Sequence, residues 1–161
     1  MADEHASITR FREALAAAGG QGRIVVLPDS VHTAALAAEA LGCDVGAIAS
    51  SLLFAAEADG ARTAVLILTS GAHRVDTAKV AAILGAEALR RASPEFVKEA
   101  TGQVIGGVSP LAHPAPIPTY LDPALRAYPE LWAAAGHPAA VFSTTYDELL
   151  DLTGATELEV N

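Results

Sequence analysis

Apolar residues follow a helical period in some segments of the chain and form uninterrupted runs in others. Residues 7–18 carry apolar side chains every three or four positions, which predicts an amphipathic helix that Gly19-Gly20 ends. Uninterrupted apolar runs between turn residues predict buried strands instead. The two longest runs are residues 47–56 and 63–69, and Ala58-Asp59-Gly60 between them is typical of a hairpin turn.

Shorter helical and extended patterns alternate through the remaining sequence. Strands are predicted at residues 23–27, 88–92 and 139–144, and helices at residues 33–41, 77–84, 94–100, 129–135 and 147–152. Asp76 and Ser93 precede two of these helices as N-caps. Residues 102–118, rich in glycine and proline, are predicted to form a strand, a loop and a second strand.

Hairpins therefore mix with helical crossovers along the chain. This order predicts an α/β fold with a mixed β-sheet or barrel surrounded by helices, and it lacks the strict alternation of a Rossmann fold. We expect a short N-terminal tail at residues 1–6 and one domain over residues 7–161.

Composition narrows the possible classes of protein. The 161 residues are 52% hydrophobic, which favours a packed interior, yet no run reaches the roughly 20 apolar residues of a membrane span. Cys43 is the single cysteine, and the acidic N-terminus lacks the apolar core of a secretory signal, so we expect a cytoplasmic protein. The net charge of −9 argues against a protein that grips long nucleic acids, and in particular DNA. Contact with a single nucleotide or the end of an RNA remains compatible with it.

The stretch Gly106-Gly107-Val108-Ser109-Pro110 is the most informative for chemistry. Two glycines allow positive φ angles and close approach of a ligand, and successive backbone N–H groups there could form an oxyanion hole. The alternative interpretation is a tight turn. His113 follows the stretch and is a candidate acid–base or ligand-binding group, or else a surface histidine.

The remaining candidates are isolated polar residues. His32 stands between Ser30 and Thr33, and Asp122 precedes Pro123, where a helix N-cap is favoured over a catalytic role. No histidine pair has metal-ligand spacing and no phosphate-binding glycine motif is found, so we expect neither a metal nor a cofactor.

An adjacent pair of serines, Ser50 and Ser51, interrupts the first long apolar strand. Their side chains are expected on opposite faces, with the inward hydroxyl bonded to a neighbouring backbone carbonyl. A weaker alternative is an esterase that uses one of them as its nucleophile.

At "TGQVIGGVSPLAHP" (residues 101–114), the chain resembles the YbaK/ProX family of aminoacyl-tRNA deacylases, which are related to the editing domain of bacterial prolyl-tRNA synthetases. "HTAALAAEALG", "AIASSLLF", "LILTSGAHRVDTAKVAAILGA", "PTYLDPAL" and "VFSTTYDELLDLTGA" match further family segments in order, over about residues 7–160.

The resemblance implies hydrolysis, in trans, of the ester that links a wrong, small amino acid such as Ala, Ser or Cys to the 3′ end of a tRNA, with tRNA-Pro as a candidate. The partner would be the aminoacyl-tRNA acceptor end and possibly a synthetase. Gly106, Gly107 and Pro110 match the family's glycine loop, where N–H groups would stabilise the oxyanion while water or a ribose hydroxyl attacks. With Ser50 these glycines form the predicted catalytic set, and Pro110, Ser109, Ser51, His32, His113 and Asp122 the predicted substrate-binding set.

Ser50 marks a departure from the family. The family strand usually reads I-x-K-[ST]-L, with a lysine that contacts the substrate, and in this sequence Ser50 takes that position. A serine supplies a hydrogen bond but no cation. Arg74 or Lys79 could supply one instead. The alternative function is a non-catalytic module of the same fold that binds an aminoacyl-adenosine-like ligand, a tRNA end or a protein.

Overall fold

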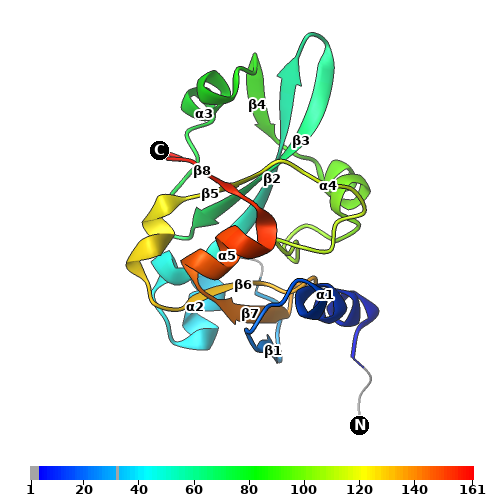
Figure 1. Ribbon diagram of the computed structural model, residues 1–161, viewed down its shortest axis with the longest axis vertical. Coiled ribbons are helices and arrows are strands. Elements are labelled where there is room, and N and C mark those ends of the chain that lie inside the picture. Colours follow the sequence, from blue (N-terminus) through cyan, green and yellow to red (C-terminus); the bar gives the residue numbers. More distant parts are fainter. Residues whose placement is uncertain (1–3, 32) are drawn as a thin grey trace.

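The computed structural model describes residues 4–31 and 33–161, which form two β-sheets with helices packed around them (Figure 1). The larger sheet has the strand order β4-β2-β3-β5-β8, and the smaller has the order β1-β7-β6. The pairing of β3 with β5 is parallel whereas β2 pairs with β3 and β4 antiparallel, so the larger sheet is mixed. The predicted mixed α/β fold is therefore confirmed.

The elements of the described residues are as follows. The strands are β1 (Ile24–Val26), β2 (Ala49–Ala58), β3 (Ala61–Ser70), β4 (Ala88–Arg91), β5 (Thr119–Leu121), β6 (Leu131–Ala134), β7 (Ala140–Thr144) and β8 (Thr156–Glu157). The helices are α1 (Ala6–Ala17), α2 (Ala34–Leu41), α3 (Thr77–Leu84), α4 (Pro94–Thr101) and α5 (Tyr146–Thr153), with 3-10 turns η1 (Val45–Ala47) and η2 (Pro123–Ala127).

The long hairpin of β2 and β3 is the centre of the fold. The two strands pair along their whole length, from Ala49 opposite Ser70 to Ala58 opposite Ala61. Asp59 and Gly60 form the tight turn with φ angles of 52° and 77°, a region that glycine adopts without strain. The hairpin prediction is confirmed, and the strands run two residues further into the turn than expected.

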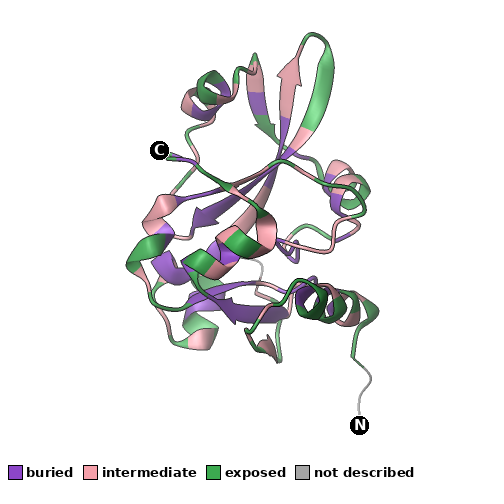
Figure 2. Cartoon of the chain, viewed as in Figure 1, coloured by how far each residue is buried: buried purple, intermediate pink, exposed green. Residues whose placement is uncertain are grey.

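The main core lies between the two sheets, where the strands are buried (Figure 2). The Phe11 ring from α1 packs on Phe142 of β7 with centroids 4.7 Å apart, and both are fully buried. A second cluster on the other face of the hairpin contains Phe54, Ile67 and Val80, which places α3 on that face. The hairpin is therefore covered on both faces, which explains its long apolar runs.

Helix ends follow the predicted capping residues. The Asp76 carboxylate accepts a hydrogen bond from the Lys79 N–H (3.1 Å), and the Ser93 hydroxyl accepts one from the Phe96 N–H (3.2 Å). Gly42 and Gly85 adopt left-handed conformations directly after α2 and α3. These helices therefore begin and end where local sequence chemistry predicts.

Two segments differ from the prediction. Residues 129–135, expected to be helical, contain strand β6, because pairing of Ala133 with Phe142 on β7 outweighs the helix propensity of alanine in so short a segment. Residues 102–118, expected to include two strands, form turns and loop, and the strand begins only at Thr119. Side-chain hydrogen bonds satisfy part of this loop's backbone instead of a strand partner.

Candidate functional site

A cavity of ≈ 280 Å³ lies beside the part of β2 that β4 leaves uncovered. β3 pairs with all of β2, whereas β4 reaches only residues 54–57. Across residues 4–31 and 33–161, no strand pairs with residues 50–53 on this second side. The residues that border the cavity include Thr33, Ala34 and Ala37 at α2, residues 48–53, Arg91 and Ala92, Val97 of α4, Ile105, Gly106 and Val108, residues 132–134, Pro138 and Val141.

The backbone of Ser51 faces this open strand edge. Leu53 accepts a hydrogen bond through its C=O from the Ala92 N–H (3.1 Å), so its polar backbone groups point away from β3. Along an antiparallel strand, alternate residues direct N–H and C=O to the same side. Ser51, two residues earlier and beyond the end of β4, therefore presents its N–H and C=O toward the cavity.

The Ser51 hydroxyl is buried and has no hydrogen-bond partner in the described part of the chain. The expectation that the inward serine bonds to a backbone carbonyl is therefore wrong. Leaving such a group unpaired costs about 1–3 kcal/mol. Because Ser51 also borders the cavity, a polar group of a bound ligand is the natural partner for this hydroxyl.

Ser50 borders the same cavity, although its side chain emerges on the other face of β2. It lies opposite Thr69 of β3 and is half-buried. Cavity walls therefore extend around the strand edge and include positions from both faces of β2.

Gly106 and Gly107 occupy different environments. Gly106 borders the cavity and has a φ angle of 89°, which an L side chain rarely adopts. Gly107 packs against the backbone of the β6–β7 connection, where an added Cβ would lie 2.7 Å from Pro138 N. The Gly107 N–H donates to Val104 O (3.0 Å), so this amide is already engaged within the turn. Of the two glycines predicted to be catalytic, Gly106 is the one at the cavity.

A buried hydrogen-bond network around Gln103 holds the glycine loop. The Gln103 side-chain oxygen accepts hydrogen bonds from the Ser109 N–H (2.7 Å) and hydroxyl (3.0 Å), and its amide nitrogen donates to Leu111 O (3.1 Å). The hydroxyl of Ser109, which is fully buried, lies 2.6 Å from Leu111 O. Ser109 thus stabilises the glycine loop through its contacts with Gln103 and Leu111. Sequence reasoning missed Gln103, because its burial and its hydrogen bonds to Ser109 and Leu111 arise only when the loop folds.

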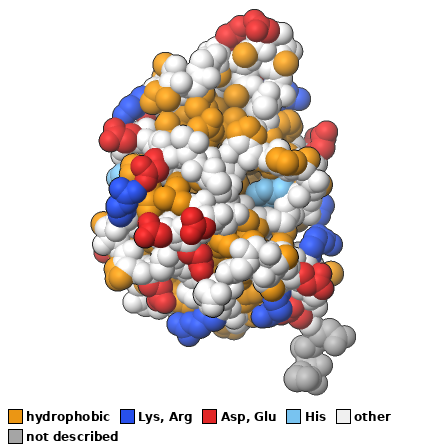
Figure 3. Space-filling view, in the orientation of Figure 1, with side chains coloured by type: hydrophobic (Ala, Val, Ile, Leu, Met, Phe, Trp, Pro, Cys, Tyr) orange, Lys and Arg blue, Asp and Glu red, His pale blue; other side chains and the backbone are white. Residues whose placement is uncertain are grey.

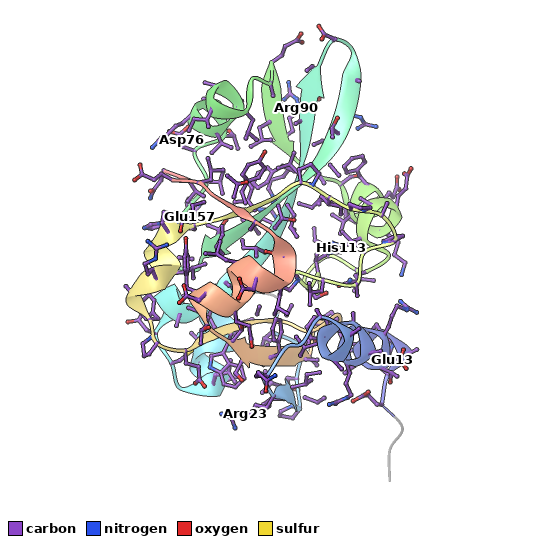
Figure 4. All side chains as sticks on the ribbon, in the orientation of Figure 1. Glu13, Arg23, Asp76, Arg90, His113 and Glu157 are labelled. Carbon is purple, nitrogen blue, oxygen red and sulfur yellow. The ribbon has the colours of Figure 1, made fainter. Side chains whose placement is uncertain are left out.

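Pro110 and His113 border a second, shallower hollow rather than the cavity at β2. Figure 4 places His113 in the loop between α4 and β5. Its Nε2 lies 2.9 Å from Ser109 O, which identifies Nε2–H as the donor. Burial lowers the pKa of His113 below its ordinary value, while the bond to Ser109 acts in the opposite direction.

Asp122 lies outside the residues that border the cavity, and its carboxylate has structural partners. Oδ1 accepts a hydrogen bond from the Ala124 N–H (3.0 Å), which confirms the predicted cap, at the 3-10 turn η2. Oδ2 accepts one from the Ser70 N–H (3.1 Å) and lies 2.9 Å from His73 Nδ1. His32, the remaining predicted residue, lies outside the described residues.

The charged side chain at the cavity is not one of those expected. Neither Arg74 nor Lys79 borders it, and the Lys79 ammonium instead donates to the Asn161 carbonyl (2.6 Å). Among the described residues at the cavity, Arg91 at the end of β4 is the charged one. Sequence reasoning missed Arg91, because its place depends on where β4 stops along β2.

Within residues 4–31 and 33–161, no helix is long and apolar enough to cross a membrane. The same residues contain no group of three or more His, Cys, Asp or Glu side chains arranged to hold a metal ion.

Comparison with known proteins connects this architecture to one family. Residues 28–152 match the aminoacyl-tRNA editing domain. A crystal structure of a proposed trans-editing enzyme for prolyl tRNA synthetase is 44% identical, with a TM-score of 0.89 and 99% of each chain covered. The structure of the protein APE2540 is 26% identical with a TM-score of 0.84, covering 94% of this chain and 98% of that one. The YwhH protein of Bacillus subtilis (strain 168) is 35% identical over 126 residues, which are 77% of this chain and 76% of that protein. The chain therefore belongs to the family of aminoacyl-tRNA editing domains, as its resemblance to YbaK/ProX proteins predicted.

Proposed function

We propose that the protein is a trans-acting deacylase that hydrolyses the ester between a small amino acid and the 3′-terminal adenosine of a mischarged tRNA. The observation that carries this proposal is the buried Ser51 hydroxyl at the open edge of β2, which has no partner among the described residues and lies in a cavity that Gly106 also borders. Membership of the editing-domain family and the likeness to a proposed trans-editing enzyme support it. The aminoacyl group would occupy the cavity, and the ribose would lie at its mouth.

The cavity offers binding and stabilising groups for ester hydrolysis. Water adds to the ester carbonyl, whose oxygen gains negative charge. The free hydroxyl of the terminal ribose is not the final acyl acceptor, because its attack would only move the ester to the neighbouring ribose oxygen. Backbone N–H groups at Gly106 and Val108 are candidates to stabilise that charge, since both residues border the cavity. The ester C–O bond then breaks, and the leaving ribose oxygen takes up the proton lost by the nucleophile.

Ser51 contributes binding rather than attack in this mechanism. A serine nucleophile needs a base within about 3 Å, and the Ser51 hydroxyl has no such partner among the described residues. Its hydroxyl and the backbone at the strand edge are suited to hold the amino group of the aminoacyl moiety. This arrangement disfavours the serine-esterase alternative at Ser51.

The size of the cavity favours a small amino acid. Ala49, Ala133 and Ala134 contribute short side chains to its walls, and Trp132 and Val141 add apolar surface. Synthetase pockets discriminate poorly between small amino acids that differ by one group, which is the error that a second hydrolytic site corrects. We propose Ala, Ser or Cys on tRNA-Pro as the first substrates to test.

The charge distribution favours contact with the end of the tRNA alone. Acidic side chains gather at the tip of the β2–β3 hairpin and over α5 on the face in view (Figure 3). With a net charge of −9, this protein would repel a long duplex, so the acceptor end is the proposed partner. Because the proposed enzyme acts on a tRNA that a synthetase has just mischarged, the proposal also includes a transient contact with that synthetase.

Hydrolysis of mischarged tRNAs tests the function directly. Ala-, Ser- and Cys-tRNA-Pro are incubated with the protein and with a Ser50→Lys variant, and the remaining ester is measured against a protein-free blank. Hydrolysis by the natural chain supports the proposal and identifies the substrate. Blank-level rates with every ester contradict it, and activity confined to Ser50→Lys would indicate the non-catalytic binding module that the missing lysine suggests.

A further inference from the structure

The cavity has a single charged side chain among its described residues, and it comes from an unexpected strand. Arg91 is the last residue of β4, beside the uncovered segment of β2, and it is exposed to solvent. No described carboxylate lies within ion-pair distance of it. Its charge is therefore free to act on a ligand at the cavity.

Arg91 and Ser50 project from the same face of the larger sheet. Arg91 lies directly opposite Phe54 on β2, and directly opposite residues in an antiparallel pair share a face. Ser50 is four residues before Phe54, so it too lies on this face, about 13 Å away along the strand. The Arg91 cation therefore shares a face of the sheet with the position that carries lysine in the family, and it lies farther along β2.

Packing directs the Arg91 side chain. The guanidinium carbon lies 5.7 Å from the centroid of the Phe54 ring, a cation–π arrangement that limits its range of motion. Arg90, the neighbouring residue, emerges on the opposite face and pairs with Glu57 (Nε to Oε1, 3.2 Å). Two adjacent arginines on one strand thus have different environments, and only Arg91 borders the cavity.

We propose that Arg91 is the phosphate-binding residue of this site and holds the phosphate that precedes the terminal adenosine of the substrate. The inference rests on the proposed function and extends it to the nucleotide part of the substrate. A guanidinium keeps its charge at all physiological pH values and binds phosphate oxygens through two parallel N–H donors. In an acidic protein, one cation at the mouth of the cavity provides the local attraction that the overall charge lacks.

Binding of unreactive substrate analogues separates this proposal from catalysis. Two probes carry alanine on a 3′-amino-3′-deoxyadenosine through an amide, one as the bare nucleoside and one at the end of a CpCpA trinucleotide. Dissociation constants are measured by calorimetry for the natural chain and for Arg91→Ala, Arg91→Lys and Arg90→Ala.

We expect Arg91→Ala to weaken binding of the trinucleotide probe by about tenfold or more and to leave the nucleoside probe within about twofold. The salt dependence of trinucleotide binding should fall by about 0.7 in log–log slope, the value for one phosphate contact on a single strand. Arg91→Lys should recover part of the affinity, and Arg90→Ala should match the natural chain.

Equal losses for both probes would mean that Arg91 supports the fold rather than a phosphate, and would overturn the proposal. An Arg91→Ala variant that binds the trinucleotide as tightly as the natural chain would overturn it as well. If the natural chain binds the probes but hydrolyses no mischarged tRNA, the proposed function fails while the role of Arg91 still stands on the binding data.

Discussion

His73 Nδ1 lies 2.9 Å from Asp122 Oδ2, which joins the loop after β3 to the turn after β5. The same oxygen accepts the Ser70 N–H, and the other carboxylate oxygen accepts the Ala124 N–H. Asp122 is 2% exposed, so water cannot replace these bonds. One buried carboxylate therefore connects two loops at the end of the central hairpin.

Removal of this carboxylate should destabilise the protein more than loss of an ordinary helix cap. We expect Asp122→Ala to lower the free energy of unfolding by about 2–4 kcal/mol, because buried N–H donors lose their acceptor. Urea denaturation measures the change. Asp76→Ala is the matched control, since Asp76 caps α3 at an exposed position, and it should cost about 1 kcal/mol. Similar losses in both variants would show that Asp122 acts only as a cap.

Replacement of Ser51 should separate activity from stability. Ser51→Ala removes a buried hydroxyl that has no partner in the described structure, so the free energy of unfolding should stay the same or rise by up to about 1 kcal/mol. Deacylation should fall at least several-fold, as kcat/KM on the identified substrate reports.

Ser109 provides the comparison for this serine. Its hydroxyl lies within hydrogen-bond distance of Leu111 O and Gln103 Oε1, so Ser109→Ala should lower the free energy of unfolding by about 1–3 kcal/mol. If Ser51→Ala is destabilised as much as Ser109→Ala, the Ser51 hydroxyl makes a hydrogen bond in the folded protein in solution, which contradicts the prediction.

An added methyl group at Gly107 should displace the glycine loop. The new Cβ would lie 2.7 Å from the backbone of His137 and Pro138, which cannot turn aside as a side chain can. We expect Gly107→Ala to cost about 1–3 kcal/mol of stability and to reduce kcat/KM more than tenfold, because Gly106 at the cavity moves with it.

A second glycine serves as the control for strain alone. Gly85 after α3 has a positive φ and open space around it, so Gly85→Ala should cost about 1 kcal/mol and leave kcat/KM unchanged. Loss of activity in both variants would point to general destabilisation instead of a displaced loop.

His113 should make stability depend on pH in mildly acidic solution. Burial lowers the pKa of His113 from its ordinary value of 6.5, so the unfolded chain binds a proton more readily than the folded one. The contribution to stability is therefore complete above pH 6.5 and is lost as the pH falls below it. Urea denaturation between pH 7.5 and pH 5 should show a smaller decline for His113→Gln than for the natural chain. Identical declines would exclude this histidine as a source.

Local sequence determined the helix ends and the hairpin turn. Asp76 and Ser93 begin helices and Gly60 completes the hairpin turn, because caps and turns depend on the backbone of a few adjacent residues. The order of family motifs likewise identified the editing domain, and the Ser50 departure was visible in the sequence.

Tertiary structure alone decided the rest. Leu131–Ala134 became a strand because β7 supplied its hydrogen-bond partners, which local propensity cannot register. Whether the backbone of Ser51 is paired, and whether Arg91 borders the cavity, depends on where β4 stops along β2. The residues that surround the cavity come from segments far apart in the chain, so their proximity arises only when the two sheets pack together and the hairpin edge is left open.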